Sequence, residues 1–315
     1  MTPRIAVIGA GLAGLACATG LRRAGFPVTV LDKGRGPGGR MSARRVETPR
    51  GQVTFDHGAQ YFTARAPGFR AQVEAWALDG VCAPWPAAGD DAWVGTPAMN
   101  APIRALAQPL EVVWGRRVET LVSRAKGWTL IAEGAAPLEA EIVILAVPAE
   151  QAADLLDAHD PAGARLARAT PAAPCWTLMA SFPERLPVAA DIFRSDGVIG
   201  WAARNNAKPG RGDTEAWVIQ ASPQWSAAHL EDPAEAVAGA LAGAFAELAG
   251  VAWPAPLSLA AHRWRYARSG AAGAQALWSP ETGLGVCGDW LVGPRVECAW
   301  LSGQALARKV AAAPA

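Results

Sequence analysis

At the start of the chain, the apolar and polar positions switch from a strand pattern to a helix pattern and back. Residues 4–8 have the continuous apolar run of a buried parallel strand, and residues 12–24 fit a helix that ends at Gly25. Residues 27–32 form the next apolar run. Small residues in the helix allow it to pack closely on a sheet. This order predicts a βαβ unit with a glycine-containing turn between its first strand and its helix.

Short strands are predicted farther along, with turns at Gly127 and Gly134. The predicted strands are residues 110–114, 118–122, 128–131 and 141–146. The run 142–147 is apolar at every position, which indicates a strand buried on both faces. We therefore expect a meander of strands that returns into the parallel sheet.

The remaining pattern mixes strands and helices. Helices are expected at 150–170, 233–250 and 296–312, and strands within 174–220 and at 284–288. The chain has 315 residues, enough for two domains. The predicted fold class is α/β, with a nucleotide-binding domain built from both ends and the middle of the chain and the rest inserted between them.

Composition narrows the function classes. The net charge is +1, only 18% of the residues are charged, and no long basic or acidic run is present. This disfavours nucleic acid as a partner, and an anionic ligand would have to be met by local arginines. No stretch approaches the roughly 20 apolar residues of a membrane span.

The five cysteines are scattered and contain no C-x-x-C pair. A disulfide framework or a zinc site is therefore disfavoured, no metal is predicted, and a reducing compartment fits. The apolar N-terminus lacks an A-x-A-like cleavage site. We expect a soluble cytoplasmic protein; the sequence does not predict its oligomeric state.

The motif Gly9-Ala10-Gly11-Leu12-Ala13-Gly14 lies between the first predicted strand and the first helix. In such a motif, Gly9 allows a tight turn, Gly11 lets a pyrophosphate approach the backbone, and Gly14 lets the helix pack on the strand. Asp32 ends the second strand, where a carboxylate can accept hydrogen bonds from ribose hydroxyls. These features favour dinucleotide binding over a ligand-free helix–strand junction.

Two further glycine motifs extend this site. Gly36-Pro37-Gly38-Gly39-Arg40 follows Asp32, and Gly285-Val286-Cys287-Gly288-Asp289-Trp290 precedes the last helix. The N-terminus of that helix, near Val296, could stabilise an anionic reduced flavin. A ligand that uses all three motifs is long, which favours FAD over a dissociable nicotinamide.

These motifs together resemble the flavin amine oxidase superfamily. Several longer stretches resemble its renalase branch, especially the bacterial members. The stretches are Asp32–Met41, Phe55–Thr63, Ala203–Arg211 and His262–Tyr266. They span most of the chain, and the second is the most specific.

The resemblance implies a Rossmann-type, p-hydroxybenzoate-hydroxylase-like FAD-binding domain with an inserted α+β substrate domain. The expected FAD-binding domain comprises 1–70, 100–160 and 262–315; the expected substrate domain comprises 71–99 and 161–261. The implied reaction is oxidation of 2-dihydro or 6-dihydro NAD(P) to NAD(P)+ by hydride transfer to flavin N5. O2 would take the electrons as H2O2, and the role would be metabolite repair.

The resemblance also implies the site residues. The expected cofactor-binding residues are Gly9, Gly11, Leu12, Ala13, Gly14, Asp32, Lys33, Gly38, Gly39, Arg40, Met41, Val118, Gly288, Asp289 and Val296. The expected catalytic residues are His57, Gln60, Tyr61, His262 and Trp264, although each histidine could equally make only structural hydrogen bonds. Hydride transfer needs proximity and alignment rather than a nucleophile, which fits such polar and aromatic side chains.

The substrate side leaves alternatives open. Trp201 is expected to face the ligand, and Arg204, Lys208 and Arg211 to meet substrate phosphates. Equally, Lys208–Gly212 fits a solvated hairpin turn. The alternative enzyme is an FAD-dependent oxidase or dehydrogenase of a small amine, and the alternative of another class is a non-catalytic flavin-binding redox sensor.

Overall fold

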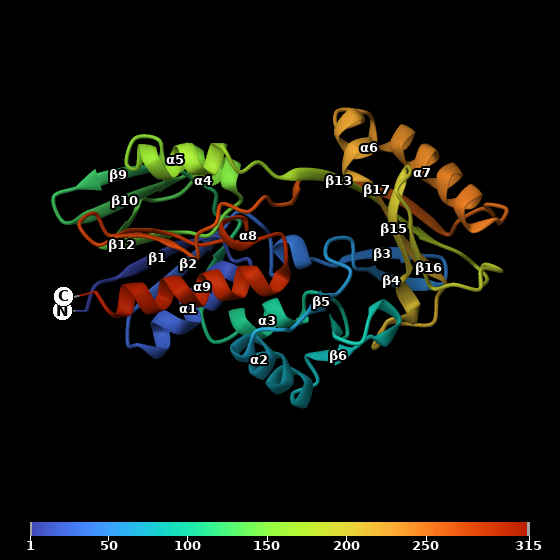
Figure 1. Cartoon of the computed structure of the whole chain (residues 1–315), viewed down its shortest axis with the longest axis horizontal. Coiled ribbons are helices and arrows are strands. Elements are labelled where there is room, and N and C mark those ends of the chain that lie inside the picture. Colours follow the sequence, from blue (N-terminus) through green and yellow to red (C-terminus); the bar gives the residue numbers. More distant parts are fainter. Residues whose placement is uncertain (1, 314–315) are drawn as a thin grey trace. The chain divides into compact units, whose positions relative to one another are not determined.

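The computed structural model describes residues 2–313 and divides them into two units (Figure 1). Residues 2–39, 103–172 and 269–313 form the first unit, and residues 40–102 and 173–268 form the second. Among the described residues, no helix combines the length and the apolar character that crossing a membrane requires.

A six-stranded sheet forms the centre of the first unit. Its strands, in spatial order, are β18 (Leu277–Ser279), β19 (Leu284–Val286), β12 (Ile142–Leu145), β1 (Ile5–Ile8), β2 (Val28–Asp32) and β8 (Glu111–Trp114). All neighbours in this sheet run parallel except β18 and β19. The predicted α/β class and the N-terminal βαβ unit are therefore confirmed.

A smaller antiparallel sheet also belongs to this unit. It contains β11 (Leu138–Ala140), β10 (Gly127–Ala132) and β9 (Val118–Arg124). The strands β9 and β10 of the meander and the return into the parallel sheet at β12 agree with the prediction, whereas β11 was not predicted. Residues 111–114 do not belong to it, however, because β8 pairs with β2 at the edge of the parallel sheet.

The helices of the first unit are α1 (Leu12–Arg23), α4 (Ala149–Leu156), α5 (Pro161–Arg168), α8 (Asp289–Val292) and α9 (Val296–Ala311). Two further elements contain residues of both units: the helix α3 (Ala101–Ala107) and the 3-10 helix η1 (Gly39–Met41). Helices α1 and α9 lie side by side (Figure 1). A Cβ at Gly303 would lie 2.2 Å from the carbonyl oxygen of Ala13, so glycine is required for this approach.

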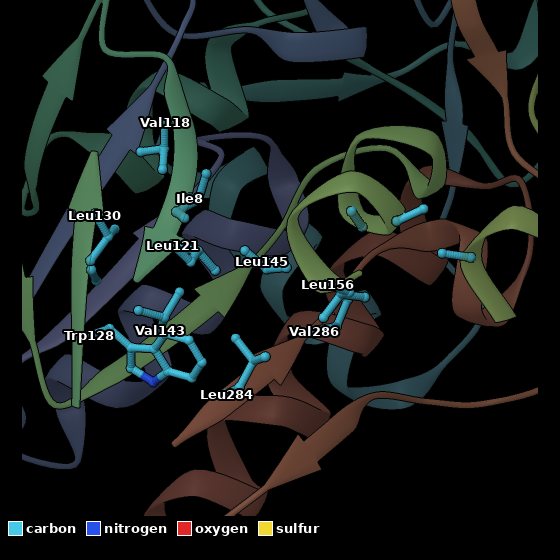
Figure 2. Close-up of a cluster of buried hydrophobic side chains, with 14 of the residues drawn as sticks. Ile8, Val118, Leu121, Trp128, Leu130, Val143, Leu145, Leu156, Leu284 and Val286 are labelled. Atoms are coloured by element: carbon cyan, nitrogen blue, oxygen red, sulfur yellow. The ribbon is translucent and has the colours of Figure 1, made fainter. Parts of the chain in front are cut away.

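Apolar side chains from both sheets form the core of this unit, and Figure 2 shows several of them. Ile8 and Leu145 come from the parallel sheet, Leu130 from the meander and Leu156 from α4. The expected single helical stretch at 150–170 is two helices, because the chain turns at Asp160 and Pro161 before α5. Ala164 and Ala167 of α5 are buried in the same core, which places 161–172 in the first unit.

The second unit is built on a five-stranded antiparallel sheet. Its strands, in spatial order, are β14 (Ile192–Arg194), β15 (Ile199–Arg204), β16 (Ala216–Ala221), β13 (Ala173–Ser181) and β17 (Ser258–Arg268). Helix α7 (Ala234–Ala249) packs its apolar face on this sheet through residues such as Leu241 and Phe245 (Figure 1).

Shorter elements complete the second unit. They are the hairpin β3 (Arg44–Thr48) and β4 (Gly51–Phe55), the sheet of β5 (Phe62–Thr63), β7 (Ala92–Gly95) and β6 (Cys82–Pro84), the helices α2 (Pro67–Leu78) and α6 (Pro223–Ala228), and the 3-10 helices η2 (Pro86–Ala88) and η3 (Asn205–Ala207).

The unit boundaries differ from the expected domain boundaries at three further places. Residues 100–102, expected in the FAD-binding domain, lie in the second unit. Residues 40–70 lie in the second unit, because Val53 and Phe55 of β4 pack with Met179 and Val218 of the five-stranded sheet. Residues 262–268 also lie there, because β17 pairs with β13 as far as Arg268.

Candidate functional site

The turn between β1 and α1 depends on two of its glycines. Gly9 has a φ of +110°, and a Cβ there would lie 2.4 Å from the carbonyl oxygen of Ala146. A Cβ at Gly14 would lie 1.9 Å from the carbonyl oxygen of Gly9. Both positions therefore require glycine for the turn and the helix to close against the sheet.

Gly11 has a different environment. A Cβ at this position would have no atom within 4 Å. Gly11 is also the N-cap of α1, which receives no side-chain capping hydrogen bond. The first-turn N–H groups of a helix, here those of Leu12 and Ala13, have no acceptor within the helix. Open space beside these donors fits the pyrophosphate of a dinucleotide.

Asp32 links the first glycine motif to the start of the loop that leads to the second motif. Its Oδ2 accepts a hydrogen bond from the Ala10 N–H (2.6 Å), and its Oδ1 accepts one from the Gly34 N–H (2.6 Å). Each oxygen retains a second lone pair, so a contact with a ribose hydroxyl is still possible. Sequence reasoning gave Asp32 only the ribose contact and missed its role in shaping the loop.

The C-terminal motif lies where β19 passes into α8. Asp289 is buried, and its Oδ2 accepts a hydrogen bond from the Ser269 hydroxyl (2.8 Å). The Gly288 N–H donates to the Ser302 hydroxyl of α9 (3.0 Å). The indole N–H of Trp290 is buried and has no acceptor within residues 2–313, and a cofactor oxygen would supply one. Sequence reasoning did not include Trp290 in the site.

The other expected cofactor residues are distributed unevenly. Gly38 and Gly39 lie in the first unit, and Lys33 is exposed and donates to Gln151 Oε1 (3.1 Å). Helix α9 begins at Val296, as predicted. Val118 is buried in the apolar core of the first unit. Arg40 and Met41 belong to the second unit, so the expected cofactor set is not confined to one unit.

Three expected catalytic residues of the second unit form one aromatic cluster. His57 follows β4, and His262 and Trp264 are neighbours on one face of β17. The ring centroids of His57 lie 4.9 Å from His262 and 5.1 Å from Trp264, and those of His262 and Trp264 are 4.7 Å apart. The indole N–H of Trp264 donates to the His57 carbonyl oxygen (2.8 Å), which fixes the cluster.

Both histidines of this cluster are uncharged at neutral pH. Burial lowers the pKa of His57 to about 4, with further lowering by His262 and the positive charge of Arg44. Burial also lowers the pKa of His262, and Arg44 adds to this effect. The cluster therefore presents neutral imidazoles and an indole, which suits contact with a planar ring better than proton transfer.

Tyr61 belongs to a second aromatic group. Its ring centroid lies 5.4 Å from that of Trp201 on β15 and 6.5 Å from that of Trp85. The guanidinium carbon of Arg194 lies 4.8 Å from the centre of the Trp201 ring. Tyr61 and Trp201 are thus brought together as neighbours, as a ligand-facing pair would be.

Gln60 does not fit its expected catalytic role, because its amide is used within the protein. The amide nitrogen donates to the carbonyl oxygens of Asp56 and Gly58, and the amide oxygen accepts from Lys208 Nζ (3.0 Å). Only 5% of Gln60 is exposed. Gln60 therefore holds the loop that carries His57.

The same buried network includes two of the expected phosphate-binding cations. Lys208 Nζ lies 3.1 Å from Asp56 Oδ2, and the Arg211 guanidinium donates to the same oxygen. The side chains of Asp56 and Lys208 have no exposed surface, and that of Arg211 is almost completely buried. Both cations are buried and neutralise Asp56. This placement agrees neither with binding of substrate phosphates nor with a solvated hairpin turn.

Arg204 is also unsuited to the phosphate-binding role that we expected. Its guanidinium donates to Glu215 Oε1 (2.6 Å) and Oε2 (2.8 Å), and its Nε lies 2.8 Å from Asp191 Oδ1. The side chain has no exposed surface. It forms a buried ion pair, in which removal of one partner is strongly destabilising.

Two family models match the chain. One describes an NAD(P)-binding Rossmann-like domain and matches residues 7–74. The other describes flavin-containing amine oxidoreductases and matches residues 86–311, more than half of the chain. Among curated proteins, FLOWERING LOCUS D of Arabidopsis thaliana is 42% identical over 59 residues, a match that covers 19% of this chain and 8% of that protein.

Solved structures share the fold at low identity. A putative protoporphyrinogen oxidase from Exiguobacterium sp. 255-15 has a TM-score of 0.78 and 12% identity, with 99% of both chains covered. Putrescine oxidase bound to putrescine has a TM-score of 0.74 and 15% identity, with 99% of this chain and 100% of that chain covered. Cyclohexylamine oxidase from Brevibacterium oxydans IH-35A has a TM-score of 0.71 and 13% identity, with 99% of both chains covered.

FAD fits this site as the cofactor for three reasons. Open space at Gly11 lies beside the first-turn N–H groups of α1, the carboxylates of Asp32 and Asp289 can accept hydrogen bonds, and the Trp290 N–H lacks an acceptor within residues 2–313. The family match covers residues 86–102 and 173–268 of the second unit as well as the C-terminal motif. The chain therefore belongs to the flavin-containing amine oxidoreductase family, and it is an FAD-dependent oxidoreductase.

Proposed function

We propose that this protein oxidises isomeric dihydronicotinamide dinucleotides, the 2-dihydro or 6-dihydro forms of NAD(P), to NAD(P)+. This is the reaction implied by the resemblance to the renalase branch. When bound, FAD would supply the hydride acceptor, and O2 would be the final electron acceptor, reduced to H2O2 by the two electrons and proton of the hydride and one proton from solvent. The removal of such isomers would be a metabolite-repair role.

The observation that carries this proposal is the charge around the His57–His262–Trp264 cluster. Within the described residues, the charged groups that shift the pKa values of its two histidines are Arg44 and Asp56. Asp56 is already neutralised by Lys208 and Arg211. The Asp56 carboxylate is therefore not available to bind a substrate ammonium, whereas a dihydropyridine ring needs no anionic partner.

The chain's own residues would act by binding and orientation. The Trp264 N–H fixes the His57 backbone, and the neutral imidazoles and the indole can flank a planar ring. His57 is buried and His262 and Trp264 are half-buried, so the cluster would limit the access of water to a bound ring. None of these steps requires a nucleophile or a general base.

A small-amine oxidase is the second candidate, because putrescine oxidase and cyclohexylamine oxidase share the fold. The test is anaerobic mixing of the purified yellow protein with each substrate class while flavin absorbance is followed. We expect rapid bleaching by 2-dihydro or 6-dihydro NAD(P) and none by ordinary 4-dihydro NADH, with H2O2 formed when air is admitted. Bleaching by putrescine or cyclohexylamine alone would favour the second candidate and reject the first.

A further inference from the structure

The hairpin of β3 and β4 places two adjacent arginines on opposite faces. Arg44 pairs with Phe55 across the hairpin, and Val46 pairs with Val53. Val46, Val53 and Phe55 pack together in one apolar cluster. Because side chains alternate along a strand, Arg44 lies on the face of this cluster and Arg45 lies on the other face.

Arg44 is next to the aromatic cluster of the second unit. Phe55, its partner across the hairpin, precedes His57 by two residues, and the Ser42 hydroxyl oxygen lies 3.5 Å from His57 Nε2. The Arg44 charge lowers the pKa of both His57 and His262, in agreement with this position.

The side chain of Arg44 is exposed and forms no ion pair with any acidic residue within residues 2–313. Several other arginines of the second unit do have acidic partners: Arg65 pairs with Asp91, and Arg263 and Arg265 pair with Glu231. Arg44 therefore adds positive charge beside an otherwise neutral aromatic cluster.

We propose that Arg44 binds a phosphate group of the dinucleotide substrate and so selects an anionic nicotinamide compound over an ammonium. A guanidinium can donate two parallel hydrogen bonds to a phosphate, and its charge repels a cationic amine. This inference rests on the proposed function and assigns the phosphate contact to a residue other than the three buried cations.

The test compares Arg44→Met with the matched control Arg45→Met. The substrates are 2-dihydro or 6-dihydro NAD and the corresponding dihydronicotinamide riboside, which has no phosphate. Loss of a charge-assisted contact should raise the KM of Arg44→Met for the dinucleotide roughly 10- to 100-fold. The KM for the riboside and the maximal bleaching rate should change less than about twofold, because the phosphate is remote from the reacting carbon. Arg45→Met should behave as the wild type with both substrates.

A binding measurement separates this inference from the proposed function. NAD+ binding is followed through the change in the flavin spectrum, without turnover, in the wild type and both variants. Weaker NAD+ binding in Arg44→Met, but not in Arg45→Met, supports the inference. A lack of flavin bleaching by every dihydronicotinamide would reject only the proposed function and would leave this binding result standing. The role of Arg44 would be overturned if both substitutions weakened NAD+ binding equally. It would also be overturned if Arg44→Met raised the KM equally for the dinucleotide and the riboside.

Discussion

Replacement of Lys208 by methionine tests the buried network around Asp56. The ammonium lies 3.1 Å from Asp56 Oδ2 and 3.0 Å from Gln60 Oε1, and its side chain has no exposed surface. Burial lowers the pKa of Lys208 to about 8, although the charge of Asp56 opposes this shift. Methionine has a similar length and no charge, so Lys208→Met removes the titration while largely retaining the packing.

The direction in which pH changes the free energy of unfolding follows from the pH at which Lys208 loses its proton in the folded and in the unfolded state. The folded protein loses the Lys208 proton near pH 8, whereas the unfolded chain keeps it until near its ordinary pKa of 10.5. Between these values the unfolded state binds more protons, so this lysine makes the free energy of unfolding rise with pH. The rise between pH 8 and pH 10 is about 2 kcal/mol.

Urea denaturation of the holoprotein, followed by tryptophan fluorescence at pH values from 7 to 10, measures this effect. Other titrating groups contribute equally to the wild type and the variant, so the relevant quantity is the difference between their free energies of unfolding. We expect that difference to grow in favour of the wild type by about 2 kcal/mol from pH 8 to pH 10. Lys126→Met, at an exposed lysine, should give no such change.

Parallel pH profiles for the wild type and Lys208→Met would refute this reasoning. They would mean that Lys208 has the same proton affinity in the folded and unfolded chains. The ion pair with Asp56 would then offset the whole cost of burying the ammonium.

Two predictions concern the cofactor. The Gly11→Ala variant should fold normally but have a lower flavin-to-protein absorbance ratio, because the added Cβ enters the open space beside α1. The comparison variant Gly14→Ala should instead give a lower yield of folded protein, because its Cβ would lie 1.9 Å from the Gly9 carbonyl oxygen. Normal flavin content in Gly11→Ala would argue against a pyrophosphate there. In reconstitution titrations, Asp289→Ala should weaken FAD binding by more than the control Ser269→Ala, which retains the carboxylate. The effect of Asp289→Ala on FAD binding should also be larger than its effect on substrate preference. Equal FAD affinity in these two variants would contradict a direct role for the Asp289 carboxylate.

The sequence predicted the local parts of the fold best. The unit β1–α1–β2 was predicted closely, because each of its elements has its own apolar period and the glycine turn joins them in sequence. The strand at β8 was also predicted, but its place beside β2 was not. Pairing between distant strands depends on tertiary packing, which the local pattern does not contain.

The site was less predictable where charged residues are buried. The stretch around Lys208 has the composition of a solvated turn, and only the distant Asp56 makes its burial possible. Arg204 is likewise buried because Glu215 and Asp191 meet it. In contrast, His57, His262 and Trp264 were found because their motifs resemble a known family, and the structure brings all three together.

The discontinuous first unit also has a consequence for synthesis of the protein. β19 and α9 complete the sheet and cover α1, but they are translated roughly 250 residues after β2. At roughly 5–20 residues per second, the nascent β1–α1–β2 unit remains without them for roughly 10–50 s. Until then, the edge of β12 that pairs with β19 and the face of α1 that Gly303 of α9 contacts at Ala13 and Cys17 are open, so we expect FAD to bind only after the Gly285–Asp289 motif has been translated.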